Sequence, residues 1–565
     1  MTSSPDDEKF QPLLKRYKVI RDPVHDDIWV TRLECNIIDH PYFQRLRRIK
    51  QLATTDLVYP GAIHNRFMHS LGVLFIADSI LNACKNNELS KRDSIGTDIH
   101  EISNEDIFKT RLVALMHDMA HISWGHTIEN EGNLIKKSQW ENEPRRKKIL
   151  NEINPIITLS LKEAGLENRS DILEEIENIL IAEENGEDLI HKLKNPYIAD
   201  IVGDTICADL LDYLKRDFFF SGLHMSYDPR IITYFAVIKY NNQKVKDENP
   251  KERLALLIEL TEEKVRYDIL NSCIQLLRMR YSLAQAVYLH RVKIMFSSMA
   301  IKMIQSAKIV NLITDDDLFE LGDEVIIYKI GMQKGNDYDS KAAIKLADAL
   351  HKRKKYKCIH EIKVRGQVNR HPLEMIQEQP EWRYALERFF EEVFELEPGS
   401  LIIYPMKENS GKAAKVKILM MDEYGNKITN TFEEMAKTHE KLKDTYEKEL
   451  DSLRALYQDM WTTCIFVDEK NYEEIMRRLK GRNNLYKNLF KQTLATGRPT
   501  KEIISIREIY TSNEGLSPEE ESLIYNVIFP SQGGVDVRSE GKKGWNLIHD
   551  IDAAIKNIIQ HRPSS

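Results

Sequence analysis

Apolar residues recur at helical spacing through much of the first 360 residues of the chain. Four of them in the segment 37–52 stand three positions apart: Phe43, Leu46, Ile49 and Leu52. This spacing places them on one face of a helix, the face that packs against a core. Comparable spacing predicts helices over later segments: 64–85, 156–194, 204–219, 252–309 and 341–350. The hydrophobic pattern therefore predicts a mainly α protein.

Strand patterns are fewer, and they gather after residue 395. The segment 17–30 predicts two short strands around a turn at 21–27, where Asp and Pro supply turn chemistry. Further strands are expected at these positions: 231–240, 325–330, 401–404, 416–421 and 462–467. We therefore expect three parts: a polar N-terminal tail over 1–16, a helical core over 17–395 and a smaller C-terminal α+β domain over 396–565.

Composition narrows the class of protein. The 565 residues are 42% hydrophobic and 30% charged, with a formal net charge of −7. This is typical of a soluble chain with several domains and argues against a dedicated nucleic-acid binder. The six cysteines are widely spaced with no CxxC pair, which suits free thiols in a reducing compartment. No stretch approaches the roughly 20 apolar residues of a membrane span. We expect a cytoplasmic protein with no membrane partner.

Histidine and aspartate at the end of a predicted buried helix are the first candidate for chemistry. An apolar run over 112–116 leads directly into His117 and Asp118, and His121 and His126 follow closely. Burying an ionised carboxylate is costly unless a partner neutralises it, and a divalent metal is a compact partner. For the dipeptide alone, a satisfied pair within the core is the alternative.

Two other helices carry residues that change this balance. His69 opens the helix predicted from residue 64, and Asp209 lies on the helix predicted over 204–219. With His117 and Asp118 they supply imidazole and carboxylate ligands, which suit a divalent ion such as Mg, Mn, Fe or Zn. Asp212, Tyr213 and Asp217 share one stripe with Asp209; a solvated acidic face is the alternative interpretation of that stripe.

The order His…His-Asp…Asp resembles the HD-domain phosphohydrolases. Several segments show a closer similarity to the deoxynucleoside triphosphate triphosphohydrolases, including the SAM-and-HD-domain dNTPase of animals and the bacterial dGTPase-like enzymes: 21–25, 43–52, 59–62 and 64–73. The resemblance covers roughly residues 17–225. It implies an HD-domain helical core and metal-dependent hydrolysis of a dNTP to deoxynucleoside and inorganic triphosphate, with dGTP as a candidate preferred substrate.

The resemblance also implies roles for single residues. Three are expected to act on the phosphates: His121 in acid/base chemistry, His126 at the α-phosphate and Arg66 as a phosphate contact. Four are expected to bind the nucleoside: Gln51, Leu52, Tyr213 and Asp217. The Tyr213 ring would fill the space of a 2′-hydroxyl, and the Asp217 carboxylate would accept from the 3′-hydroxyl.

Relatives of this kind are activated by a nucleotide at a subunit interface, which implies a homo-oligomer, either a tetramer or a hexamer. Five residues match the activator-site pattern: Lys18, Val19, Asp39, Gln44 and Arg47.

One departure from the family concerns the phosphates. Leu210 stands where the animal enzyme has a phosphate-binding lysine directly after the last metal aspartate. Other cations would have to neutralise the phosphates, and we name Lys215, Arg216 and Lys354 as candidates. The segment 122–126, which includes Trp124, also differs from the small, Pro-containing turn that is usual in the family. Two alternatives stay open: an HD phosphohydrolase acting on nucleoside monophosphates or a signalling nucleotide, and a nucleotide-sensing protein without turnover.

Overall fold

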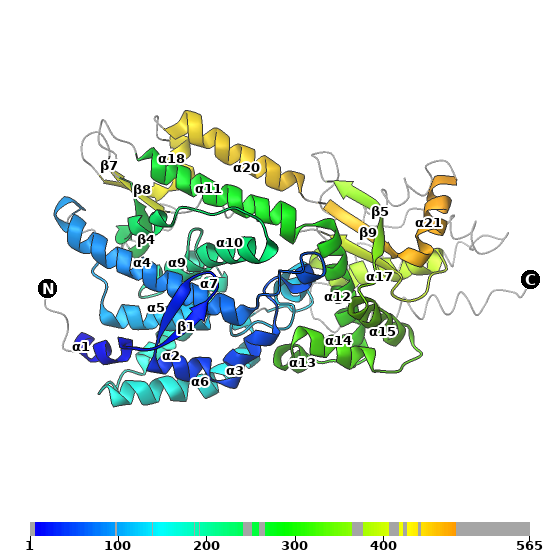
Figure 1. Cartoon of the computed structure of the whole chain (residues 1–565), viewed down its shortest axis with the longest axis horizontal. Coiled ribbons are helices and arrows are strands. Elements are labelled where there is room, and N and C mark those ends of the chain that lie inside the picture. Colours follow the sequence, from blue (N-terminus) through cyan, green and yellow to red (C-terminus); the bar gives the residue numbers. More distant parts are fainter. Residues whose placement is uncertain are drawn as a thin grey trace, which may run out of the picture.

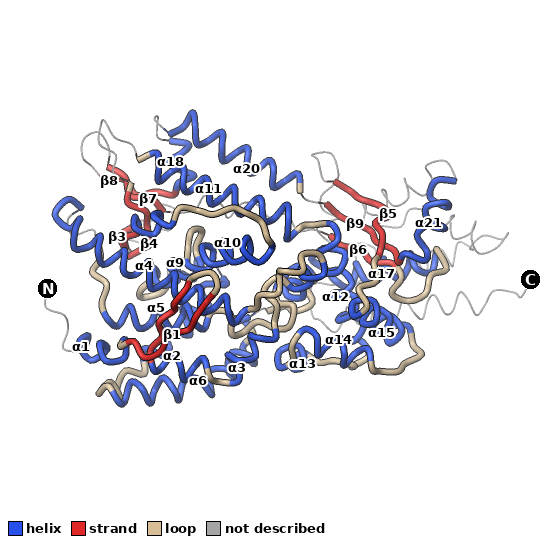
Figure 2. Tube along the Cα trace, in the orientation of Figure 1, coloured by secondary structure: helices blue, strands red, loops and turns tan. Residues whose placement is uncertain are grey.

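The structure, a computed structural model, describes residues 6–481 except these internal gaps: 96–98, 138, 186, 191, 241–250, 259–265, 364–376, 406–416, 422–426, 439–441 and 461. Within these residues the protein is built mainly of helices, and its strands form three small sheets (Figures 1 and 2). The predicted mainly α class is confirmed. The C-terminal part of the proposed domain 396–565, from residue 482, lies outside the described residues.

A β-hairpin precedes the helical core. Strands β1 (Arg16–Asp22) and β2 (Asp26–Thr31) pair antiparallel, as the pattern over 17–30 predicts. The Asp22 carboxylate closes the turn by accepting hydrogen bonds from the backbone N–H groups of Val24 and His25, each at 2.9 Å. Strand β1 is exposed on both faces over residues 16–19, whereas Asp22 at its end is buried.

Helices α4 (Arg66–Ile95), α5 (Asn104–Met116) and α10 (Ala208–Ser221) form the centre of the core, and α4 packs against both of the others. A capping box starts α5: the Ser103 hydroxyl accepts from the Asp106 N–H, and the Asp106 carboxylate accepts from the Ser103 N–H. The apolar run 112–116 ends this helix inside the core, which places His117 at its C-cap.

One described helix is long and apolar enough to cross a membrane by length and composition, namely α4 over Arg66–Leu89. However, 72% of its most apolar window is buried inside the protein. Helices α5 and α10 cover it, so its apolar surface is explained by core packing.

The other described helices lie outside this group of three. Those of the first half are α1 (Asp7–Phe10), α2 (Arg32–Ile38), α3 (Pro41–Gln44), α6 (Glu143–Glu163), α7 (Asp171–Asn185), α8 (Glu187–Ile190) and α9 (Pro196–Gly203). Those of the second half are α11 (Tyr267–Leu283), α12 (Arg291–Ile309), α13 (Asp315–Glu320), α14 (Asp323–Gly331), α15 (Tyr338–His351), α17 (Pro380–Val393), α18 (Phe432–Thr438), α20 (Lys448–Asp459) and α21 (Glu469–Gly481). Figure 1 shows α12 to α15 grouped beside the core that holds α4, α5 and α10.

Three predicted elements are wrong. The single helix expected over 37–52 is instead the end of α2, helix α3 and a 3-10 turn at Arg45–Arg48, because Pro41 holds the preceding His40 in an extended conformation. The strand expected at 325–330 is part of helix α14, which buries Ile326 and Ile330 one turn apart. Its run of β-branched residues favours a strand, and packing of that apolar face overrides the preference. The helix expected from residue 252 begins instead as strand β4 (Lys251–Leu257), and helix α11 starts at Tyr267.

Strands from the last part of the described chain complete two sheets begun earlier. One sheet has the order β3-β4-β7-β8, with β3 (Phe235–Tyr240), β7 (Lys417–Met421) and β8 (Lys427–Thr431). The other has the order β5-β9-β6, with β5 (Tyr356–Lys363), β6 (Leu401–Pro405) and β9 (Thr462–Asp468). Strand β7 pairs parallel to β4, and β9 pairs with β5. The boundary at residue 395 stays a prediction.

Candidate metal centre

The four predicted metal ligands meet between α4, the end of α5 and the start of α10. The Nε2 atom of His69 lies 3.0 Å from Oδ1 of Asp209 and 3.9 Å from Oδ2 of Asp118. The Nε2 atom of His117 lies 3.5 Å from Oδ1 of Asp118. Ligand atoms of His69, His117 and Asp118 all lie within 4.8 Å of one another.

The hydrogen bonding and the chemical types of these ligand atoms suit a divalent metal. Nδ1 of His117 is within hydrogen-bond distance (2.8 Å) of the Ala114 carbonyl, which leaves its Nε2 buried with no hydrogen-bond partner among the described residues. A buried polar atom without a partner is costly. Two imidazole nitrogens and two carboxylates form a donor set that a divalent ion satisfies. The predicted metal cofactor is therefore confirmed, and the identity of the ion is left open.

Asp118 is held in the ionised form that a ligand needs. Its burial would raise its pKa, but Arg66, His117 and His121 together hold the pKa well below its ordinary value. The Arg66 guanidinium donates to Oδ2 of Asp118 at 2.7 Å, and Nε2 of His121 lies 3.2 Å from Oδ1.

Arg66, the predicted phosphate contact, is enclosed by the loop that follows Asp118. Arg66 is only 1% exposed. A Cβ atom on Gly125 would lie 2.4 Å from its guanidinium, and Gly125 has a φ of +41°. Both observations require glycine at this position. Trp124 in the same loop is buried, so its side chain packs into the core. Its backbone N–H donates to the Asp323 carboxylate.

His121 belongs to a buried hydrogen-bonded pair that the sequence pattern does not reveal. Nδ1 of His121 lies 2.6 Å from Oε2 of Glu129, and the Arg145 guanidinium lies 3.2 Å from Oε1 of that carboxylate. Burial and Arg66 oppose a charge on His121, but Glu129 and Asp118 raise its pKa. The two residues are eight positions apart and are joined by a π-helical turn, Thr127–Glu131, so no regular spacing marks the pair.

His126 lies beside this pair and is exposed. Its ring meets the His121 ring edge-on, with the centroids 4.7 Å apart. An exposed imidazole next to a buried one can contact a ligand that enters from solvent.

The predicted nucleoside residues lie near the metal ligands on the same helix or on adjoining segments. Tyr213 is one turn beyond Asp209 on α10 and is partly buried. Asp217, predicted to accept from a 3′-hydroxyl, is 1% exposed, and both of its oxygens already have partners: Nε2 of His64 at 2.8 Å and the Tyr288 hydroxyl at 2.5 Å. His64 and Tyr288 are additions that the sequence pattern does not supply.

Gln51 and Leu52 occupy the turn that leads toward α4. The Gln51 N–H donates to the His64 carbonyl at 3.0 Å, which ties this turn to the start of the α4 segment. Oε1 of Gln51 is buried with no hydrogen-bond partner among the described residues, and Leu52 is partly buried. An unpartnered amide oxygen of this kind is available to a ligand.

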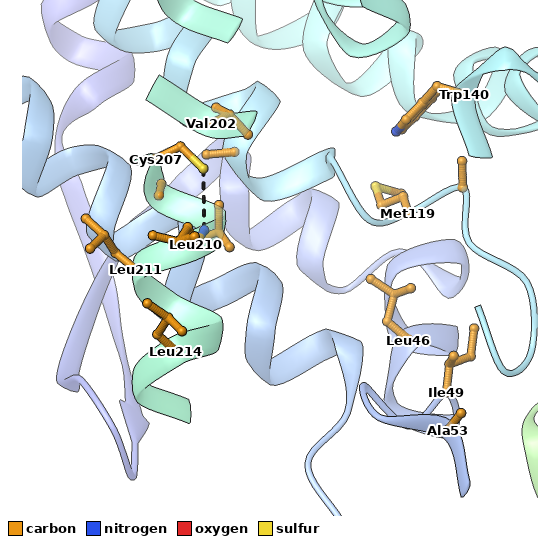
Figure 3. Packing of buried hydrophobic residues seen from close by; sticks show 14 of the residues in the cluster. Leu46, Ile49, Ala53, Met119, Trp140, Val202, Cys207, Leu210, Leu211 and Leu214 are labelled. Carbon is orange, nitrogen blue, oxygen red and sulfur yellow. Dashed lines mark hydrogen bonds between the residues drawn. The ribbon is translucent and has the colours of Figure 1, made fainter. Parts of the chain in front are cut away.

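Leu210 belongs to the hydrophobic core. It is 4% exposed, and Figure 3 shows it among Val202, Cys207, Leu211 and Leu214. Its backbone N–H donates to Sγ of Cys207, the N-cap of α10, at 3.4 Å. A lysine at this position would need a different side-chain path to reach a phosphate.

The cations proposed in place of that lysine are placed differently. Arg216 is 0% exposed and is paired with Asp212 and Asp22, so it is not available to a phosphate. Lys215 is exposed. Lys354 pairs with Asp348 in a basic hollow of about 770 Å³ between α15 and β9, and no metal ligand lines that hollow.

Arg280, at the end of α11, is a cation that the sequence analysis missed. No hydrogen bond or ion pair holds its guanidinium within the described part of the chain. The nearby Tyr213 hydroxyl raises its pKa despite burial, and Tyr457, Tyr288 and Cys207 act in the same direction. The only sequence signal is a basic residue in the last turn of a helix, which is common.

The predicted activator-site residues lie on the surface around β1 and the segment after α2. Lys18, Val19, Asp39 and Arg47 are exposed, and Gln44 is partly buried. The Arg47 guanidinium donates to the Gln44 side chain at 2.8 Å. Burial raises the pKa of Cys35, Lys18 lowers it and Asp39 raises it, so both charges lie near this thiol.

Known proteins share this region of the chain. Residues 66–217 match the family model described as HD domain. The deoxynucleoside triphosphate triphosphohydrolase SAMHD1 of Gallus gallus is 31% identical over 247 residues, covering 40% of this chain and 38% of that protein. SAMHD1 of Mus musculus is 30% identical over 294 residues, covering 49% and 42%. An uncharacterized protein of Methanocaldococcus jannaschii is 36% identical over 208 residues, covering 36% and 34%.

The matched region is limited in extent. The chain spans 34 to 42% of the length of these three relatives. A crystal structure of a hypothetical protein from Aquifex aeolicus has a TM-score of 0.54 at 20% sequence identity, covering 82% of this chain and 100% of that one. This likeness supports the fold.

Fold and site together define a class: residues 66–217 match the HD-domain family model, and they contain a cluster of His and Asp side chains suited to a divalent metal. Within that class, the chain is similar to the deoxynucleoside triphosphate triphosphohydrolases, which confirms the resemblance that the motifs indicate.

Proposed function

We propose that the protein hydrolyses dNTPs to deoxynucleoside and inorganic triphosphate. The observation that carries the proposal is the buried Nε2 of His117, which has no hydrogen-bond partner among the described residues and lies beside Asp118. Asp209, on the third segment of the cluster, is one helical turn before Tyr213. In this reaction a water oxygen bonds to the α-phosphorus, the bond to the 5′ oxygen breaks, and the 5′ oxygen takes up a proton. A divalent metal, when bound, supplies positive charge that polarises the phosphate and lowers the pKa of a water.

The residues around the metal ligands can move the proton. His121 is oriented by Glu129, which is itself held by Arg145, so its imidazole can exchange a proton without changing position. We assign His121 to acid/base chemistry. His126 stands at the exposed edge of the site, where it can meet the α-phosphate, and Arg66 fixes the Asp118 carboxylate from the buried side.

Arg280 is the residue that we assign to the phosphates in place of the family's lysine. Its guanidinium forms no ion pair with any residue that the structure describes, and it lies near Tyr213 and Cys207 at the start of α10. A planar guanidinium can donate two hydrogen bonds to one phosphate.

The direct experiment incubates the purified protein with Mn²⁺ and each dNTP and measures deoxynucleoside and inorganic triphosphate by chromatography. Release of both products supports the proposal, and the relative rates test the expected preference for dGTP. Turnover of nucleoside monophosphates alone, with release of phosphate, would support the first alternative. Tight binding without turnover would support a nucleotide sensor.

The Tyr213→Ala variant should lose discrimination against ribonucleotides. The tyrosine ring is expected to fill the space of a 2′-hydroxyl, so its removal should lower the ratio of dGTP to GTP turnover by about 10- to 100-fold. Tyr213→Phe keeps the ring and is the matched control. An unchanged ratio in Tyr213→Ala would contradict the assignment.

The Arg280→Ala variant should raise KM for dNTPs by about tenfold or more, because a charge-assisted hydrogen bond to a phosphate is lost. Arg278→Ala removes an exposed arginine of the same helix, paired with Glu449, and is the matched control. Initial rates across dGTP concentrations measure the effect. Equal KM values in the Arg280→Ala and wild-type proteins would show that another cation holds the phosphates.

We further propose that a nucleotide bound near Lys18, Val19, Asp39, Gln44 and Arg47 activates a tetramer or hexamer. The exposure of Lys18, Val19, Asp39 and Arg47 supports this proposal. Light scattering with and without added dNTPs tests it, and an unchanging monomer with full activity would contradict it. Six free cysteines support a reducing, cytoplasmic location.

A further inference from the structure

We propose that the Asp22–His25 turn of the N-terminal hairpin is a positioning element of the metal centre, acting on the ligand His69 through the carboxylate of Asp212. The turn lies nearly 50 residues before the first metal ligand, and neither Asp212 nor this turn has a role in the chemistry described above. The proposal rests on the metal centre and is independent of the substrate.

Asp212 connects the hairpin turn to His69. It is 0% exposed on α10, and its Oδ2 lies 2.7 Å from Nδ1 of His69. Its Oδ1 lies 2.6 Å from Nε2 of His25. Nε and Nη2 of Arg216 donate to the same carboxylate, each at 2.9 Å. Both oxygens are therefore fully engaged by three different side chains.

This contact determines which nitrogen of His69 faces the ligands. An ionised carboxylate only accepts hydrogen bonds, so the proton of His69 is held on Nδ1. Nε2, which lies 3.0 Å from Asp209, then presents a lone pair to the metal position. A carboxylate behind a metal-binding imidazole both fixes the ring and raises its basicity.

The hairpin turn holds Asp212 from the far side. His25 is stacked on Phe75 of α4, with the ring centroids 4.9 Å apart. Asp22 closes the turn through the N–H of His25 and also pairs with Arg216, whose Nη1 lies 2.9 Å from its Oδ2. The turn thus restrains two of the partners of Asp212, which stands 187 residues from His25 along the chain.

Gly72 supplies the space for this arrangement. It lies one turn beyond His69 on α4, and a Cβ atom there would lie 1.8 Å from Oδ1 of Asp212 and 2.5 Å from Nη2 of Arg216. A side chain at position 72 would displace the Asp212 carboxylate. Glycine is therefore required at position 72, because a side chain there would displace the carboxylate that contacts His69.

The test measures Mn²⁺ binding by calorimetry in the metal-stripped full chain, without nucleotide, so that its outcome is separate from that of the proposed activity. His25→Ala should raise the Mn²⁺ Kd by about tenfold, within the range known for residues behind a metal-binding histidine. His25→Gln keeps an N–H donor near the position of Nε2 and should recover most of the affinity. Co²⁺-loaded His25→Ala should show shifted visible absorption bands.

Glu34→Gln is the matched control. Glu34 is also a buried carboxylate close to the hairpin, paired with Arg111 at 2.7 Å, and none of its hydrogen-bond partners is a metal ligand. It should lower thermal stability and leave the Mn²⁺ Kd within about twofold of wild type. An unchanged Kd in His25→Ala would overturn the proposal. An equal loss of affinity in Glu34→Gln, or no recovery in a folded His25→Gln protein, would also overturn it.

Discussion

Replacing His117 with alanine is expected to remove the metal and abolish turnover. The side chain supplies a buried nitrogen with no other partner among the described residues, next to Asp118 at 3.5 Å. Loss of a direct ligand should cost more than the 10- to 100-fold seen when supporting residues are removed, so we expect a fall in dNTP turnover of at least about 100-fold. Elemental analysis of the purified protein should show a parallel fall in metal content.

His224→Ala is the matched control for this experiment, because His224 is exposed on the loop after α10 and its side chain has no hydrogen bond to the described part of the chain. Its metal content and turnover should equal those of the wild-type protein. Retention of both properties in His117→Ala would show that the ligand assignment is wrong. Loss of turnover with metal retained would place His117 in substrate chemistry instead.

Replacing Asp200 with alanine should cause the largest loss of stability. Asp200 on α9 is 0% exposed, and its carboxylate accepts from Arg253 on β4 at 2.6 Å and lies 3.3 Å from Nζ of Lys417 on β7. Its removal takes this carboxylate away from the buried Arg253 guanidinium and leaves Lys417 paired with Asp204 at 2.9 Å. Losing one partner of a buried pair costs about 3–5 kcal/mol. Urea denaturation monitored by circular dichroism measures the change in the free energy of unfolding.

The loss should depend on pH in a defined way. Burial would raise the pKa of Asp200, but Arg253 and Lys417 lower it to about 2 from its ordinary value of 3.8. The stabilising contribution is therefore present above pH 3.8 and is lost as the pH falls through about 2. Asp316→Ala removes an exposed carboxylate of α13 and is the control. Equal unfolding free energies for Asp200→Ala and wild type at neutral pH would contradict this account.

These two variants affect different parts of one arrangement. Helix α9 leads directly into α10, which carries Asp209 and Tyr213, so the Asp200 pairing anchors the segment before the metal site to the sheet β3-β4-β7-β8. The hairpin turn is joined to α10 itself, through contacts of His25 with Asp212 and of Asp22 with Arg216. The predicted ligand Asp209 therefore lies on a helix whose neighbouring buried charges are paired at several points.

The sequence by itself determined the helical class and the ligand types. Helical periodicity is a local property, and so is the position of His117 and Asp118 after an apolar run. For that reason α5, α10 and the β1–β2 hairpin could be predicted closely from residue order alone. The strand expected at 325–330 failed because short runs of β-branched residues fit either a strand or a buried helix, and packing decides between them.

Only the tertiary structure decided which partners each site residue has. Glu129 beside His121, Tyr288 beside Asp217 and the turn behind Asp212 are contacts between segments with no fixed spacing along the chain. The role of Leu210 was also decided by the fold. In the sequence it is only a leucine at the position of the family's lysine, whereas in the structure it is buried in the core. By charge alone Arg216 could bind a phosphate, but it is buried and paired with the carboxylates of Asp22 and Asp212. Asp212 in turn contacts His69.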